Sequence, residues 1–214
     1  MTIWIDALLV LLVVVNLWLL GSARLRSCIR AVAVQGVVLG ILPLFAPGDA
    51  PMWRLAAQAG VSVLLKAVVF PWLLQRAVRK VSITGEVEPY VGYPLSLLAG
   101  LGLLGVSVVG AARLPALGAQ ASVLTVPAAL FTLLVGLFVI VSRKKAVTQV
   151  LGYLAMENGI YAFGMALAEK EPLIVEMGIL LDVFVGAFVM GIVIYHISRE
   201  FDHVDTDRLT ALKD

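Results

Sequence analysis

Cysteine is almost absent from the sequence, which contains Cys28 and no other thiol in 214 residues. A single cysteine cannot form an intrachain disulfide, and it cannot supply the ligand set of an iron–sulfur cluster or a structural zinc site. We therefore expect no metal site and no cofactor site in this chain, and we expect electron transfer not to pass through this chain alone.

Charged residues are also scarce, at 14% of the sequence, whereas a soluble domain carries roughly 25%. Hydrophobic residues make up 61%, and the mean hydropathy is +1.03. A soluble fold of this composition would expose large apolar patches to water. The sequence therefore predicts an integral membrane protein in a lipid bilayer, and the net charge of +2 gives no indication of nucleic-acid binding.

Long apolar runs fill most of the chain, and a spanning helix takes about 20 such residues. Seven runs qualify, at about 3–21, 31–47, 53–77, 95–112, 121–142, 146–168 and 172–197. The first lacks the basic start of a cleaved signal peptide, so we expect it to be retained as a helix. The predicted fold class is all-α, a polytopic membrane bundle of about seven transmembrane helices.

Basic residues alternate between the connections. They are Arg24, Arg26 and Arg30 in the first connection, Arg76, Arg79 and Lys80 in the third, and Arg143, Lys144 and Lys145 in the fifth. Because cytoplasmic loops are enriched in lysine and arginine, we expect the N-terminus outside and the tail at 199–214 in the cytoplasm. The location expected is the cytoplasmic (inner) membrane of a bacterium or archaeon.

Glycines recur within the predicted spans. Gly36 and Gly40 form a GxxxG pair, and the fourth span carries Gly100, Gly102, Gly105 and Gly110. Small residues let helix backbones approach closely in lipid. We interpret all of them as packing positions.

Two carboxylates fall near the middle of the last two spans. With a rise of 1.5 Å per residue, Glu157 lies roughly 16 Å from the cytoplasmic side and Asp182 roughly 15 Å from the outer side. A hydrocarbon core is about 30 Å thick, so both are near its midplane. An ionisable group at this depth is costly and marks a candidate functional site.

Two further charges lie within the apolar runs. Lys66 is also near mid-depth, and Pro71 follows it, which is expected to free the carbonyl of Ala67 and kink the helix. Glu176 lies only roughly 6 Å below the outer surface. We interpret Glu157, Asp182 and Lys66 as a proton or cation relay, with Glu176 as an outer branch. The alternative is a structural ion pair in which the acids neutralise Lys66.

The last three spans resemble the small three-helix subunit K of complex I and its relatives in Mrp-type cation antiporters. The resemblance rests on Glu157 after the basic Arg143–Lys145 turn, and on Asp182 followed four residues later by Gly186. In that subunit the corresponding positions are membrane-embedded glutamates implicated in proton movement. The resemblance covers about 121–198.

The whole chain resembles the hydrogenase-4 component E family, found in formate hydrogenlyase and related group 4 [NiFe] hydrogenase complexes. The features that carry this resemblance are four spans before the subunit K-like part, the loop GEVEPYVGYP, and the run MENGIYAFGMAL followed by PLIVEMGILLDVFVG. It implies a membrane extension over 1–120, a subunit K-like unit over 121–198 and a tail over 199–214.

The same resemblance implies a subunit without catalytic residues of its own, inside a redox complex. The partners it implies are antiporter-like membrane subunits, a subunit-H-like membrane anchor, and peripheral hydrogenase-like subunits that carry iron–sulfur clusters and a nickel–iron site. Two alternatives remain. One is a structural spacer without a transport role, and the other is a subunit of a redox-independent Mrp-type cation/proton antiporter.

Overall fold

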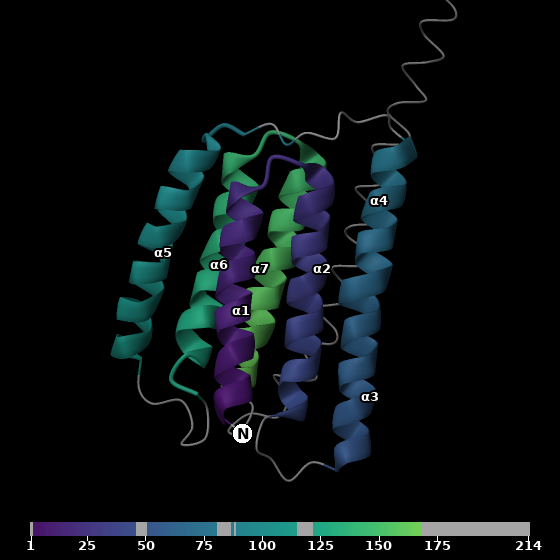
Figure 1. Cartoon of the computed structure of the whole chain (residues 1–214), viewed down its shortest axis with the longest axis vertical. Coiled ribbons are helices and arrows are strands. Elements are labelled where there is room, and N and C mark those ends of the chain that lie inside the picture. The colour runs from purple at the N-terminus through teal and green to yellow at the C-terminus, as the bar shows by residue number, and fades with distance from the viewer. Residues whose placement is uncertain (1, 46–50, 81–86, 88, 115–121, 168–214) are drawn as a thin grey trace, which may run out of the picture.

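The computed structural model describes residues 2–45, 51–80, 87, 89–114 and 122–167, and the regular elements in these ranges are helices. In chain order they are α1 (Thr2–Gly21), α2 (Leu25–Ile41), a 3₁₀ turn η1 (Leu42–Leu44), α3 (Met52–Val63), a π-helical stretch η2 (Leu64–Val69), α4 (Phe70–Lys80), α5 (Tyr93–Arg113), α6 (Thr125–Ser142) and α7 (Ala146–Leu167). The helices stand side by side along one direction (Figure 1).

Five helical segments of the described chain are long and apolar enough to cross a membrane. They are Ile3–Gly21, Leu25–Leu44, Leu55–Arg76, Tyr93–Arg113 and Thr125–Ser142. The predicted all-α membrane bundle is therefore confirmed. Helix α7 is long enough as well, but it is less apolar and is not among the five. The span expected at 172–197 lies outside the described residues.

Helix α2 begins earlier than the sequence indicated. It starts at Leu25, not near residue 31, so that Arg26 and Arg30 are exposed residues of the helix itself. Arginine can continue a helix at a membrane surface because its long stem lies along apolar neighbours while its head stays in water. Counting only apolar residues therefore placed the start of this span too late.

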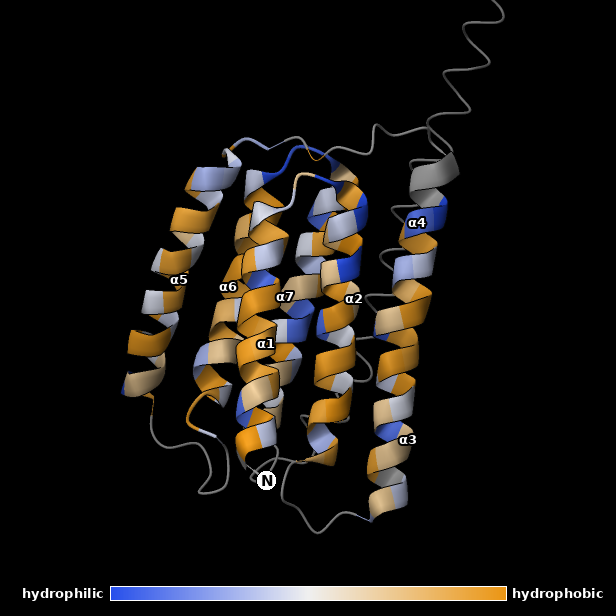
Figure 2. Cartoon of the chain, in the orientation of Figure 1, coloured by the Kyte–Doolittle hydropathy of each residue, from blue (hydrophilic) through white to orange (hydrophobic). Residues whose placement is uncertain are grey.

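Four helices form the centre of the bundle. Helix α6 packs along α7, and α1 and α2 pack against each other and against this pair. Helix α5 lies at one side against α6 and α1, and the segment from α3 to α4 lies at the other side against α2 (Figure 1). Hydrophobic residues cover most of the ribbons, and hydrophilic residues gather at the end where α1 and α6 finish (Figure 2).

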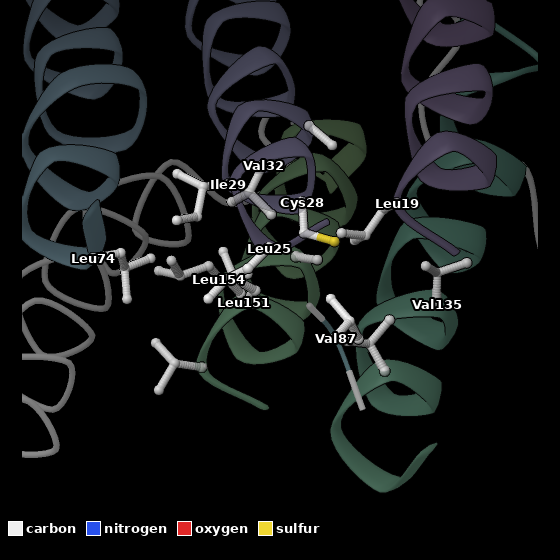
Figure 3. Packing of buried hydrophobic residues seen from close by; sticks show 14 of the residues in the cluster. Leu19, Leu25, Cys28, Ile29, Val32, Leu74, Val87, Val135, Leu151 and Leu154 are labelled. Carbon is white, nitrogen blue, oxygen red and sulfur yellow. The ribbon is translucent and has the colours of Figure 1, made fainter. Parts of the chain in front are cut away.

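The core near that end joins helices that are far apart in the sequence. Figure 3 shows Leu25, Cys28 and Ile29 of α2 beside Leu74 of α4 and Leu151 of α7. Every one of these side chains is buried. In lipid such contacts act through close van der Waals packing, since water no longer drives apolar groups together.

Glycines allow the close approach of several helix pairs. A β-carbon on Gly36 would lie 2.6 Å from Cβ of Lys66, and one on Gly40 would lie 3.2 Å from the backbone nitrogen of Val63. Packing is therefore confirmed at this GxxxG pair, as it is at Gly100 against Leu20.

For Gly102 and Gly105 the packing interpretation stays a prediction. Within the described part of the chain, a β-carbon at either position would meet no atom within 4 Å. The closest backbone approach lies instead between α6 and α7, at glycines that the pattern did not single out. Gly136 and Gly159 each face backbone atoms of the opposite helix, and a β-carbon on Gly152 would lie 2.8 Å from the nitrogen of Ile140.

Candidate functional site

Lys66 and Glu157 meet inside the bundle. The ammonium of Lys66 donates a hydrogen bond to Oε1 of Glu157 at 2.6 Å, and each side chain is only 2% exposed. Of the charges predicted near the midplane, the structure thus brings together a lysine from the third span and the acid of the sixth. Burying charged groups away from water is costly, and this contact offsets part of that cost.

Helix α7 carries the acid at the middle of its length. Glu157 lies 11 residues after Ala146 and 10 before Leu167, roughly 16 Å from the start of the helix. Gly136 and Gly152 let α7 approach α6 closely on another side. The carboxylate is therefore held on a rigid helix, well away from either end of the bundle.

The lysine lies in the π-helical stretch η2. The N–H of Phe70, which follows η2, donates to the carbonyl of Leu65, five residues back, and Pro71 has no N–H to donate. The sequence predicts a disturbed helix beside Lys66, because Pro71 cannot donate to the carbonyl of Ala67, and the structure has a π-helical stretch there. Such stretches are rare and occur often at functional sites.

Two further groups lie close to Lys66. The Nζ atom lies over the ring of Tyr161 at 4.5 Å from its centroid, and Tyr161 is one turn after Glu157 on α7. Gly36 of α2 packs against the backbone and Cβ of Lys66. The cation is therefore held between a carboxylate and the face of an aromatic ring, both favourable positions for positive charge.

Four uncharged polar side chains lie beside this pair and link four helices. They are Asn16 of α1, Gln35 of α2, Thr132 of α6 and Asn158 of α7, here called the polar chain. Asn158 Nδ2 donates to Gln35 Oε1 at 3.3 Å, and Gln35 Nε2 donates to Asn16 Oδ1 at 2.9 Å. Asn16 Nδ2 donates to Thr132 Oγ1 at 2.8 Å. All four residues are at least 98% buried.

A second buried cation lies at the end of the bundle. Arg143 is 2% exposed and donates to the carbonyls of Leu20 at 3.0 Å and Val91 at 3.3 Å. Its guanidinium lies 5.3 Å from the ring centroid of Tyr93. Burial lowers the pKa of Arg143 from its usual range, and the nearby Tyr93 and Cys28 act in the opposite direction.

The bond from Arg143 to Val91 holds the segment before α5, and three other hydrogen bonds hold the same segment. The N–H of Val87 donates to Ala23, the N–H of Tyr90 donates to Ser142, and the hydroxyl of Tyr93 donates to Val87. The sequence placed Arg143 among loop charges that orient the chain. The structure shows that it is also a buried part of the packing.

The remaining predicted site residues lie outside the described part of the chain. Asp182 and Glu176 both fall beyond residue 167, so their place in a relay stays a prediction. Among the residues that the structure describes, no group of three histidine, cysteine, aspartate or glutamate side chains is arranged to hold a metal ion.

Sequence reasoning missed the polar chain. A signal was present, because Asn16 and Gln35 each interrupt an apolar run, and polar residues inside spans usually face other helices. Thr132 and Asn158 gave a weaker signal, since threonine is common in spans and Asn158 follows the more prominent Glu157. Attention to charge alone left these amides out.

Comparisons with known proteins now add to this geometry. The family model for NADH-ubiquinone/plastoquinone oxidoreductase chain 4L matches residues 122–214. Hydrogenase-4 component E of Escherichia coli (strain K12) is 30% identical over 210 residues, which cover 95% of this chain and 94% of that protein. An uncharacterized protein of Mycobacterium tuberculosis is 35% identical over 205 residues, 95% of this chain and 93% of its own length. No solved structure matches the chain significantly.

The helices and the family model define a multi-pass membrane protein whose C-terminal part is of the chain 4L type. The similarity to hydrogenase-4 component E along nearly the whole chain then identifies the family. The protein belongs to the hydrogenase-4 component E family. Both resemblances expected from the sequence are confirmed.

Proposed function

We propose that the protein is a non-catalytic membrane subunit of a complex I-like, hydrogenase-type redox complex, in which Glu157 takes part in proton transfer coupled to electron transfer. Family membership supports the first part, because the relative in Escherichia coli is named as a component of hydrogenase-4. The buried contact between Lys66 and Glu157 carries the second part.

This pair has two protonation states that differ by one proton on Glu157. In one state the ammonium of Lys66 faces the carboxylate of Glu157. In the other, a proton from a neighbouring group binds the carboxylate, and the ionic contact between Lys66 and Glu157 becomes a contact between an ammonium and a neutral acid. Because both groups are away from water, the change in charge is felt strongly by nearby groups. A second acid within reach is then able to exchange protons with Glu157.

Asp182 is the proposed next member of the relay, and Glu176 is a proposed outer branch. Glu157 and Asp182 are expected at one depth on consecutive antiparallel spans, which favours transfer in the plane of the membrane. We propose that protons pass between this subunit and its neighbours along that plane, with Lys66 as the counter-charge that biases occupancy.

The proposed orientation places the N-terminus outside a bacterial or archaeal cytoplasmic membrane. The ends of α1, α4 and α6 lie at one end of the bundle, where Figure 2 shows hydrophilic residues. Arg24 follows α1, Arg76 lies in the last turns of α4 and Arg143 follows α6, so these basic residues belong to this end. The preference of arginine and lysine for cytoplasmic loops supports this direction.

The proposed partners are antiporter-like membrane subunits, a subunit-H-like membrane anchor and peripheral hydrogenase-like subunits. Iron–sulfur clusters and a nickel–iron site would reside in those peripheral partners. Purification of the complex through a tag on this subunit, in mild detergent, followed by mass spectrometry tests this assignment. Recovery of antiporter subunits without iron–sulfur or nickel-site proteins would overturn it.

A structural spacer is the second candidate, and the ion pair itself favours it, since a salt bridge between η2 and α7 also holds helices together. The two candidate functions predict different results for one double variant, Glu157→Gln with Asp182→Asn. Proton transfer predicts an assembled complex that translocates far fewer protons per electron. A spacer predicts poor assembly, with normal translocation in whatever complex forms.

A further inference from the structure

The polar chain has one direction, fixed at the end in α1. Asn16 Nδ2 donates to the carbonyl of Leu12 at 2.9 Å as well as to Thr132. A backbone carbonyl only accepts hydrogen bonds, so the amide nitrogen of Asn16 must face it and Oδ1 must face the other way. The hydroxyl of Thr132 donates to the carbonyl of Ala128 at 2.7 Å, which leaves its oxygen to accept from Asn16.

Each amide along the chain is oriented by the one before it. Asn16 Oδ1 accepts from Gln35 Nε2, so Gln35 Oε1 faces α7. Asn158 must then present its nitrogen to Gln35, and its own oxygen turns away from the chain. The polar chain is therefore satisfied at every step except its last atom, Asn158 Oδ1.

That atom is buried and accepts no hydrogen bond from the described part of the protein. Leaving a buried acceptor unsatisfied costs about 1–3 kcal/mol, and buried polar atoms are almost always satisfied by protein groups or by ordered water. The rest of the polar chain holds the Asn158 amide in one orientation with its acceptor directed elsewhere, which points to a bound molecule that donates a hydrogen bond.

The open acceptor lies beside the ion pair. Asn158 follows Glu157 on α7, so the two residues differ by about 1.5 Å along the helix axis. On α2, Gln35 bonds to Asn158 while the next residue, Gly36, packs against Lys66. The polar chain and the ion pair therefore meet where α2, α7 and η2 come together.

We propose that Asn158 Oδ1 binds a buried water molecule next to Lys66 and Glu157. A water molecule donates two hydrogen bonds, and it can join the amide oxygen to the carboxylate of Glu157. A sodium ion fits less well, because the other oxygens of the polar chain already accept hydrogen bonds and the Lys66 ammonium is close by. The binding site stands on this geometry, while its part in proton transfer rests on the function proposed above.

High-resolution electron cryo-microscopy of the intact complex tests the site without any variant. The proposal predicts density for one water within hydrogen-bond distance of Asn158 Oδ1, in contact with Glu157. Three results would overturn it: an acceptor that remains unoccupied, a protein side chain that donates to it, or an ion surrounded by several oxygens that follows the sodium concentration.

Asn158→Leu, which removes the acceptor, tests the role of the water. In assembled complexes we expect loss of the water density and a severalfold drop in protons translocated per electron. Ser107→Ala is the control. It removes a different buried polar group, the Ser107 hydroxyl on α5, which donates to the carbonyl of Leu103 at 2.7 Å. We expect wild-type translocation from it. Unchanged translocation in Asn158→Leu would remove the water from the relay, whereas unchanged translocation in Glu157→Gln, with the water present, would overturn only the proposed function.

Discussion

Lys66 and Arg143 are both buried cations, at 3% and 2% exposed, yet they are held in different ways. Lys66 faces a carboxylate in the middle of the bundle, in a π-helical stretch beside a proline. Arg143 faces two backbone carbonyls and an aromatic ring at the end of the bundle. One contact joins a lysine to a carboxylate, and the other joins an arginine to backbone carbonyls, which carry no titratable proton, and to the face of a ring.

The difference teaches which buried charge can take part in transport. The guanidinium keeps its proton under all ordinary conditions, and its planar fork fits several fixed acceptors at once. Burial lowers the pKa of Arg143, but Tyr93 and Cys28 oppose the change. A lysine opposite a glutamate is a pair whose occupancy can change. Arg143 accordingly has a structural role in holding backbone segments together, and the Lys66–Glu157 pair is the candidate for proton transfer.

Removing Lys66 alone should have the largest effect on stability. Lys66→Met leaves the Glu157 carboxylate buried without its ammonium, and breaking a buried pair in this way costs about 3–5 kcal/mol. Thermal unfolding of the purified complex would measure the loss. Lys144→Met removes an exposed lysine and should change little. A Lys66→Met protein as stable as the wild type would contradict the ion pair.

Replacing Arg143 by lysine should give the next largest effect. Arg143→Lys keeps the charge but loses the planar fork that reaches both Leu20 and Val91. A hydrogen bond from a charged group is worth about 1.5–3 kcal/mol. We expect faster hydrogen exchange at Val87 and at residues 90–93, with unchanged proton translocation. Reduced translocation with unchanged exchange would erase the distinction between the two cations.

Filling the space at Gly36 should disturb Lys66 from the side. In Gly36→Ala the new β-carbon would lie 2.6 Å from Cβ of Lys66, and overpacking of this kind costs about 1–3 kcal/mol. Gly102→Ala is a matched control, because its β-carbon meets no atom of the described residues within 4 Å. Equal melting temperatures for the two variants would mean that α2 and η2 are not in close contact.

Removing the hydroxyl of Tyr93 should have the smallest effect. Tyr93→Phe loses the hydrogen bond to the carbonyl of Val87, at 2.8 Å, while the ring stays over Arg143. A neutral hydrogen bond contributes about 0.5–1.5 kcal/mol. We expect a small drop in melting temperature and wild-type translocation. A loss as large as that of Arg143→Lys would show that the hydroxyl, and not the arginine, fastens this segment.

Much of the fold could be predicted from the lengths of the apolar runs in the sequence. The bounds of α1, α5 and α7 lie within about two residues of those predicted, because the bilayer sets the length of a span. The start of α2 did not follow, since Arg26 and Arg30 continue the helix. The close contact at Gly136 and Gly152 did not follow either, because these glycines are separated by the turn and show no GxxxG spacing.

For the site, the sequence predicted how deep each charged residue lies in the membrane, but not which neighbouring helix its side chain faces. The midplane positions of Lys66 and Glu157 came from counting residues, whereas their contact depends on how each helix is rotated about its axis. The π-helical stretch changes that rotation locally, and one sequence does not reveal it. The polar chain depends on four helices packing in a particular order, which periodicity cannot predict.

The most direct test of the central claim is proton translocation by the double variant Lys66→Met with Glu157→Gln. Removing both charges avoids breaking the pair from one side only, and exchanging a buried ion pair for neutral groups is often tolerated. In proteoliposomes that contain the assembled complex, protons moved per electron would be measured together with the redox rate. We predict that translocation is lost while assembly and electron transfer persist. Wild-type translocation in a normally assembled complex would show that the pair is structural and contradict the account.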